Sequence, residues 1–277
     1  MREGDFFTRH ATRPTEHDPE SSFSGISEQG VELAKARAKD LLNSVEQSQT
    51  GSVLFISGVS EMPRTRSTAE IYGKEMQNTA AQEHLDDVMI ITADEVKNIC
   101  GYKNKAAFIE QQITENPEKK IVIDIPLFLK ELSFVDNFTD SNGKWNAYTA
   151  ELLKHNNNDD QRALHEWLAN QGVMGELHGP NPKDIAEKQL AAVERLRTFV
   201  QKHIAERPII IGSVGHSWSL DALAVYLANN GKVTAEAFDT LHAKMIGESE
   251  TIALEMKNDQ PFLRYGTLEI PLNKSSL

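Results

Sequence analysis

The sequence has little of several things that particular functions need. It contains one cysteine, Cys100, in 277 residues, which excludes an internal disulfide and a cysteine-rich zinc site. Lysine and arginine number 29 against 41 aspartates and glutamates, giving a formal net charge of −12. Because proteins that neutralise nucleic-acid phosphates need a basic surface, we expect no nucleic-acid partner. Any anion site must therefore be a small local cluster of cations.

Long apolar runs are missing as well. No window approaches the roughly 18 apolar residues of a membrane span, and residues 1–5 do not resemble the apolar stretch of a secretory signal. Together with the single cysteine, this favours a reducing compartment. We expect a cytoplasmic protein that does not contact membranes.

Short apolar runs alternate along the chain with longer helical patterns. The runs predict buried strands at 5–8, 52–57, 88–92, 121–125 and 208–214. Helical spacing of apolar residues predicts helices over 31–45 and 184–203, and the tail predicts a hairpin of 251–256 with 262–270. Strands separated by helices predict an α/β fold, a three-layer sandwich whose mostly parallel sheet has helices on both faces.

The middle of the chain is richer in polar runs and turn residues, for example at 155–160 and 178–182. We therefore expect a core made of residues 1–96 and 206–277. Residues 97–205 are expected to form an inserted helical cap, whose last helix packs on the core. Since loops at strand ends usually carry specificity, segment 97–183 is expected to cover the pocket and select the substrate.

Three segments that follow predicted strands carry groups suited to an anion. Arg9, His10 and Arg13 follow the first strand, and Gly215-His216 follows the last of the buried strands. Arg64 lies near the start of a helix that Pro63 opens after the second strand, and a helix N-terminus favours anions. In open α/β sheets ligands bind outside the carboxyl ends of the strands, which makes these segments candidates for one site.

Taken together, the segments resemble the histidine phosphatase superfamily, the phosphoglycerate-mutase-like group. Its R-H-G-x-x-R-like motif is matched by residues 9–13, with Ala11 in place of glycine and one residue fewer before the last arginine. Residues 64–69 resemble its S-x-x-x-R-A-x-Q-T-A element, and residues 215–216 its late G-H. Residues 25–34 resemble the segment that opens its first helix. The matches cover roughly the first 96 and the last 72 residues.

The resemblance implies a phosphatase that hydrolyses a small phosphomonoester through a phosphohistidine on His10. It also implies that the phosphoryl group is clamped by Arg9, Arg13, Arg64 and His216, with no cofactor and no metal. The proton donor is expected shortly after the strand at 88–92. Glu95 is the first choice, and Asp94, Asp86 and Asp87 stay open.

Other functions remain as alternatives. A phosphoglycerate-type mutase is disfavoured because residues 101–105 do not resemble the mutase segment L-N-E-R-H-Y-G. A protein that binds a phosphorylated ligand with weak or no catalysis is a second alternative. A serine α/β-hydrolase is the least favoured, with Ser217 as nucleophile, Asp239 as acid and His242 as base.

Overall fold

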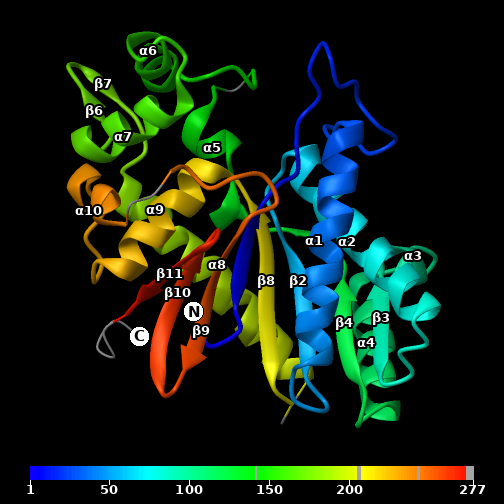
Figure 1. Ribbon diagram of the computed structural model, residues 1–277. Coiled ribbons are helices and arrows are strands. Elements are labelled where there is room, and N and C mark those ends of the chain that lie inside the picture. The colour runs from blue at the N-terminus through cyan, green and yellow to red at the C-terminus, as the bar shows by residue number, and fades with distance from the viewer. Residues whose placement is uncertain (141, 205–206, 242–243, 273–277) are drawn as a thin grey trace.

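The computed structural model describes residues 1–140, 142–204, 207–241 and 244–272. Within them, nine strands form one sheet in the order β11-β10-β9-β1-β8-β2-β4-β3, with β5 beside β2 (Figure 1). The strands are β1 (Phe6–Arg9), β2 (Val53–Val59), β3 (Val88–Thr92), β4 (Lys120–Asp124), β5 (Leu127–Phe128), β8 (Ile209–Gly215), β9 (Thr251–Lys257), β10 (Gln260–Tyr265) and β11 (Leu268–Pro271). The neighbouring strands β1, β8, β2, β4 and β3 all pair in parallel. Strands β9, β10 and β11 add antiparallel pairs at the edge next to β1.

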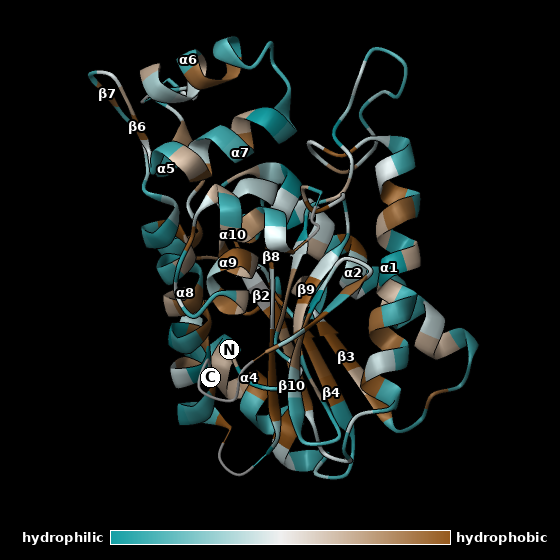
Figure 2. Ribbon diagram, turned by 60° about the vertical axis from the view of Figure 1, so that its left-hand side comes forward, coloured by the Kyte–Doolittle hydropathy of each residue, from teal (hydrophilic) through white to brown (hydrophobic). Residues whose placement is uncertain are grey.

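Helices cover both faces of this sheet. The buried residues of α1 (Glu28–Glu46) and α2 (Pro63–Gln82) pack on one face, in a cluster with Phe6. Phe7, the next residue of β1, points to the opposite face and packs with α4 (Tyr102–Glu115), α8 (Pro182–His203) and α9 (Ser217–Ala228). Figure 2 shows hydrophobic residues gathered on the central strands between these layers. The predicted three-layer α/β fold is confirmed.

The first helix is brought close to the end of β1 by local sequence. Ser27 caps α1, its side chain accepting a hydrogen bond from the Gly30 backbone N–H at 3.0 Å. A Cβ atom on Gly30 would lie 2.6 Å from the backbone oxygen of Thr12, so glycine permits this close approach. The Ser27 N–H also donates to the Thr12 oxygen at 3.0 Å, which fixes the loop after β1 against the helix.

A cap lies over the carboxyl ends of the strands (Figure 1). Its elements are η1 (Lys130–Leu132), α5 (Val135–Phe138), α6 (Ala147–His155), α7 (Asp160–Asn170), β6 (Val173–Met174) and β7 (Leu177–His178). The elements from α5 to β7 share a hydrophobic cluster with the first turns of α8, with α9 and with α10 (Ala235–Thr240), whereas Leu132 of η1 packs in the core cluster. The cap is therefore packed firmly on the core.

The expected division at residue 97 needs correction. Strand β4 lies inside the central sheet, between β2 and β3, and α4 packs on the same face as α8. Core elements thus continue to about residue 128, and the elements outside the sandwich are those from η1 to β7. The expected strand over 262–270 is in fact two strands, β10 and β11, separated by a turn at Gly266, whose φ is +57°.

A short helix, α3 (Ala93–Val96), follows β3 at the edge of the sheet. None of the described helices is both long enough and apolar enough to span a bilayer.

Candidate active site

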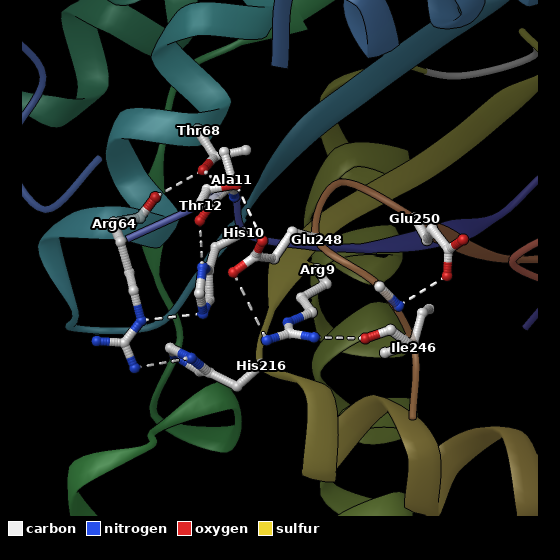
Figure 3. A network of polar contacts seen from close by, with 11 residues as sticks. Arg9, His10, Ala11, Thr12, Arg64, Thr68, His216, Ile246, Glu248 and Glu250 are labelled. Atoms are coloured by element: carbon white, nitrogen blue, oxygen red, sulfur yellow. Dashed lines mark hydrogen bonds and ion pairs between the residues drawn. The ribbon is translucent and has the colours of Figure 1, made fainter. Parts of the chain in front are cut away.

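The sequence-predicted phosphate-binding residues converge on one pocket. Strands β1, β8 and β2 are neighbours in the sheet, so the segments that leave their carboxyl ends lie side by side. The His10 N–H donates to the Gly215 oxygen at 3.1 Å, which joins the end of β1 to the end of β8. A cavity of about 80 Å³ at this point is lined by Arg9, His10, Arg13, Arg64 and His216. Figure 3 shows Arg9, His10, Arg64 and His216 gathered here.

The hydrogen bonds of His10 define its tautomer. Its Nδ1 lies 2.7 Å from the backbone oxygen of Ala11, and because a carbonyl only accepts, Nδ1 carries the proton. Nε2 is then unprotonated and accepts a hydrogen bond from Nε of Arg64 at 3.0 Å. Burial, with the charge of Arg64 second, holds the pKa of His10 well below its usual range. His10 is therefore a neutral imidazole with its lone pair directed at an arginine.

His216 is held in the opposite tautomer. Its Nδ1 accepts from Nη2 of Arg64 at 3.2 Å, so its proton lies on Nε2 and is donated to the Ser60 hydroxyl at 2.8 Å. Burial, followed by the charge of Arg64, keeps the pKa of His216 well below its usual range. The imidazole rings of His10 and His216 are 5.2 Å apart, with the Arg64 guanidinium hydrogen-bonded to both.

The positive charge of the pocket is concentrated on three arginines. Burial, together with the charges of Arg13 and Arg9, lowers the pKa of Arg64 to about 10, so Arg64 remains cationic at neutral pH. Arg9 donates from Nη1 to the Ile246 oxygen at 2.6 Å, and its Nη2 lies 3.9 Å from Glu248. The Arg13 side chain has no hydrogen-bond or ion-pair partner among the described residues. Three cations with so little neutralisation form a strong site for a dianion.

The loop after β1 is tied to the start of α2. The Ala11 N–H donates to the Thr68 hydroxyl at 3.0 Å, and that hydroxyl donates to the Arg64 backbone oxygen at 2.7 Å. Ala11, which stands where the resembling family has glycine, is fully buried and belongs to the cluster beneath α1 and α2. The methyl group of Ala11 is thus accommodated in the core. The hydrogen bonds through Thr68 hold the backbone next to His10 against the backbone of Arg64.

An aromatic side chain of the cap, Phe134, covers the histidine and the arginine on one side of the pocket. The Phe134 ring lies 4.4 Å from the His216 ring and 5.3 Å from the guanidinium carbon of Arg64. Phe134 is fixed from the core by Glu61, whose carboxylate accepts hydrogen bonds from the Phe134 and Val135 backbone N–H groups and from the Ser133 hydroxyl. Sequence reasoning missed these residues because nothing in their spacing relates them to the arginines.

The predicted proton donors do not lie at this pocket. Glu95 forms a capping box, accepting from the Thr92 N–H at 2.5 Å and the Thr92 hydroxyl at 2.6 Å, and it also accepts from Gln77. Asp94 pairs with Lys97 and Lys74, and Asp86 and Asp87 precede β3 at the opposite end of that strand.

One carboxylate of the cap does line the pocket. Among the described residues, the pocket lining includes one carboxylate side chain, that of Asp160, the first residue of α7. It has no hydrogen-bond or ion-pair partner among them. The sequence signal that could have found it is its position at the start of a helix within the segment expected to cover the pocket.

The serine-hydrolase alternative finds little support in the arrangement. Ser217 lines the pocket as the first residue of α9, and its hydroxyl makes no hydrogen bond to a histidine or carboxylate among the described residues. Asp239 pairs with His165 on the cap, at 3.2 Å, and His242 lies outside the described residues. The described residues hold no cluster of three or more His, Cys, Asp or Glu side chains that could bind a metal ion.

Comparisons with known proteins yield distant likenesses only. No profile of a known protein family matches the sequence, and no curated protein matches it. Mycobacterial glucosyl-3-phosphoglycerate phosphatase in complex with inorganic phosphate is similar in structure, with 14% identity and a TM-score of 0.48, over 95% of this chain and 96% of that one.

Two further solved structures are similar at lower scores. Phosphoserine phosphatase from Entamoeba histolytica has 11% identity and a TM-score of 0.41, covering 95% of each chain. Phosphoglycerate mutase from Bacillus anthracis has 9% identity and a TM-score of 0.43, over 97% of this chain and 92% of that one. At such scores these likenesses assign no activity, which has to be inferred from the site.

Proposed function

We propose that the protein is a histidine phosphatase that hydrolyses a small phosphomonoester through a phosphohistidine on His10. The observation that carries this proposal is the geometry of His10 and Arg64. A neutral imidazole presents its unprotonated Nε2 at 3.0 Å from a guanidinium, inside a pocket with two more arginines. This combines a nucleophile with the charges that a phosphoryl group requires.

The first step is attack by Nε2 of His10 on phosphorus. An entering phosphate oxygen takes over the Arg64 Nε–H, which frees the lone pair of Nε2. As the nitrogen–phosphorus bond forms, the bond from phosphorus to the leaving oxygen breaks. Arg9, Arg13 and Arg64 compensate the charge on the remaining phosphoryl oxygens. A bound dianion also opposes the lowering of the His216 pKa, so that Nδ1 of His216 can take up a proton from solvent and donate a hydrogen bond to a phosphoryl oxygen.

Asp160 is the proposed proton donor. In its acid form it gives a proton to the leaving oxygen, and the product alcohol departs. A water molecule then attacks the phosphohistidine, its proton passes to the Asp160 carboxylate, and the bond between phosphorus and Nε2 breaks. Inorganic phosphate and the original protonation states of both residues result.

The cellular setting is part of the proposal. Cys100 is exposed and free, which fits a reducing, cytoplasmic compartment. The net charge of −12 disfavours large polyanions, so a small ester is favoured over nucleic acid.

The test is turnover and trapping of a phosphoenzyme by wild type and by His10→Ala. Wild type should release inorganic phosphate from p-nitrophenyl phosphate and form an acid-labile phosphoenzyme, and His10→Ala should do neither. His178→Ala, which removes an exposed histidine of β7, is the matched control and should behave as wild type.

Three other results would each contradict the proposal. Turnover that survives in His10→Ala shows that His10 is not the nucleophile. Tight binding of vanadate by wild type without turnover indicates a phospho-ligand-binding protein. Transfer of the phosphoryl group to a second hydroxyl in place of water indicates a mutase.

A further inference from the structure

Apart from its histidines and arginines, the pocket is lined mostly by apolar side chains. Beyond the phosphate-binding residues, the pocket is lined by Phe134, Phe138, Trp145, Leu153 and Trp218. The other polar side chains of the lining are those of Asp160 and Ser217. A leaving group with several hydroxyls would lose its water here and find few partners, since a buried hydroxyl without a hydrogen bond is unfavourable.

The aromatic residues form a continuous series that starts at the catalytic histidines. Phe134 contacts His216, and the Trp145 ring lies 5.8 Å from Phe134 in an edge-on arrangement. On the inner side, Phe138 lies 5.2 Å from Phe134 and 5.7 Å from Trp218. Aromatic pairs favour such tilted and edge-on arrangements, and an aromatic ligand could add a further pair of the same kind at the exposed end of the series.

Trp145 stands at the mouth of the pocket with 44% of its surface exposed, whereas Phe138 and Trp218 are buried. Its backbone is held in place, because Trp145 forms a β-bridge with Thr139 and the following residue, Asn146, caps α6. Tryptophan is a large apolar side chain, and a fixed, half-exposed one beside a ligand pocket offers a contact surface that the protein itself does not fill.

We propose that the substrate is a phosphomonoester whose leaving group carries a flat apolar ring, which packs against the exposed surface of Trp145 beside Phe134 while the arginines hold the phosphate. This assignment rests on the proposed phosphatase function and specifies its substrate class. A sugar or glycerol phosphate has the same phosphate but places hydroxyls against the aromatic wall. The ring-bearing ester is accordingly preferred.

The test compares benzyl phosphate with glycerol 1-phosphate, since both have alkyl leaving oxygens and differ mainly in the apolar ring. Wild type should show a kcat/KM for benzyl phosphate at least roughly 10-fold above that for glycerol 1-phosphate. Trp145→Ala should lower this ratio several-fold. Tyr102→Ala, which removes an exposed aromatic of α4 that does not line the pocket, should leave the ratio unchanged.

The possible failures are distinguishable. If glycerol 1-phosphate is hydrolysed in a His10-dependent way as fast as benzyl phosphate, the substrate assignment is overturned and the phosphatase function stands. A ratio that Trp145→Ala leaves unchanged also overturns the assignment. If neither ester is hydrolysed and no phosphoenzyme forms, the proposed function itself is overturned, and the substrate class with it.

Discussion

Replacing Arg64 by lysine separates the charge of this residue from its geometry. Arginine donates from two nitrogens to two different imidazoles, His10 at 3.0 Å and His216 at 3.2 Å, whereas a lysine ammonium is a single point. A hydrogen bond to a charged group contributes about 1.5–3 kcal/mol. If Arg64→Lys loses one such bond to the phosphoryl group, kcat/KM should fall roughly 10- to 150-fold.

The assay is steady-state hydrolysis of p-nitrophenyl phosphate, with the affinity for vanadate measured in parallel. Arg66→Lys is the matched control, because Arg66 lies two residues further along α2, is exposed, and pairs with Glu70 at 3.0 Å. The control should stay within about twofold of wild type, as expected for an exposed pair. An Arg64→Lys enzyme that kept wild-type kcat/KM and vanadate affinity would refute the inference that phosphate binding and catalysis depend on the two-nitrogen geometry by which Arg64 contacts His10 and His216.

Three further outcomes are expected. Asp160→Asn should slow phosphoenzyme formation from an alkyl phosphate by roughly 10²- to 10⁴-fold but hardly change the burst rate of p-nitrophenol release, because that leaving group needs no proton; equal losses in this first step would exclude a proton donor. The lowered pKa of His10 means that the unfolded chain binds a proton before the native one does, so thermal stability should fall as pH drops below about 6.5, and His10→Gln should weaken this slope. Arg197→Met should lower the free energy of unfolding by about 3–5 kcal/mol, because it leaves the fully buried carboxylate of Asp5 unpaired. Arg195→Met, on the exposed side of the same helix, should cost less than about 1 kcal/mol in chemical denaturation, and similar losses for both would contradict the burial argument.

The core could be predicted from the sequence because its signals are local. Buried parallel strands are short apolar runs, and β2, β4 and β8 were visible as such. The order of strands in the sheet is a long-range property that no such run contains. The sequence therefore indicated a strand near residue 121 but not that this strand lies between β2 and β3, inside the sheet.

Some residues of the candidate site could likewise be predicted from the sequence, and one could not. His10, Arg64 and His216 each follow a strand, and the rule that parallel strands end at one edge brings such residues together. The proposed proton donor, Asp160, could not be found by that rule. Glu95 follows a strand too, but its strand is at the edge of the sheet and its carboxylate caps a helix. Asp160 reaches the pocket only because α7 folds back over the sheet, which depends on packing among distant aromatic residues.

The aromatic packing of the cap has a spectroscopic consequence. The chain has three tryptophans, and all of them lie in this cluster: Trp145 and Trp218 line the pocket, and Trp167 stacks on Trp218 at 5.8 Å. Indole fluorescence responds to nearby charge and to exclusion of water. Every intrinsic tryptophan signal from this protein thus originates within two ring contacts of the candidate active site, so ligand entry can be followed by emission without any added label.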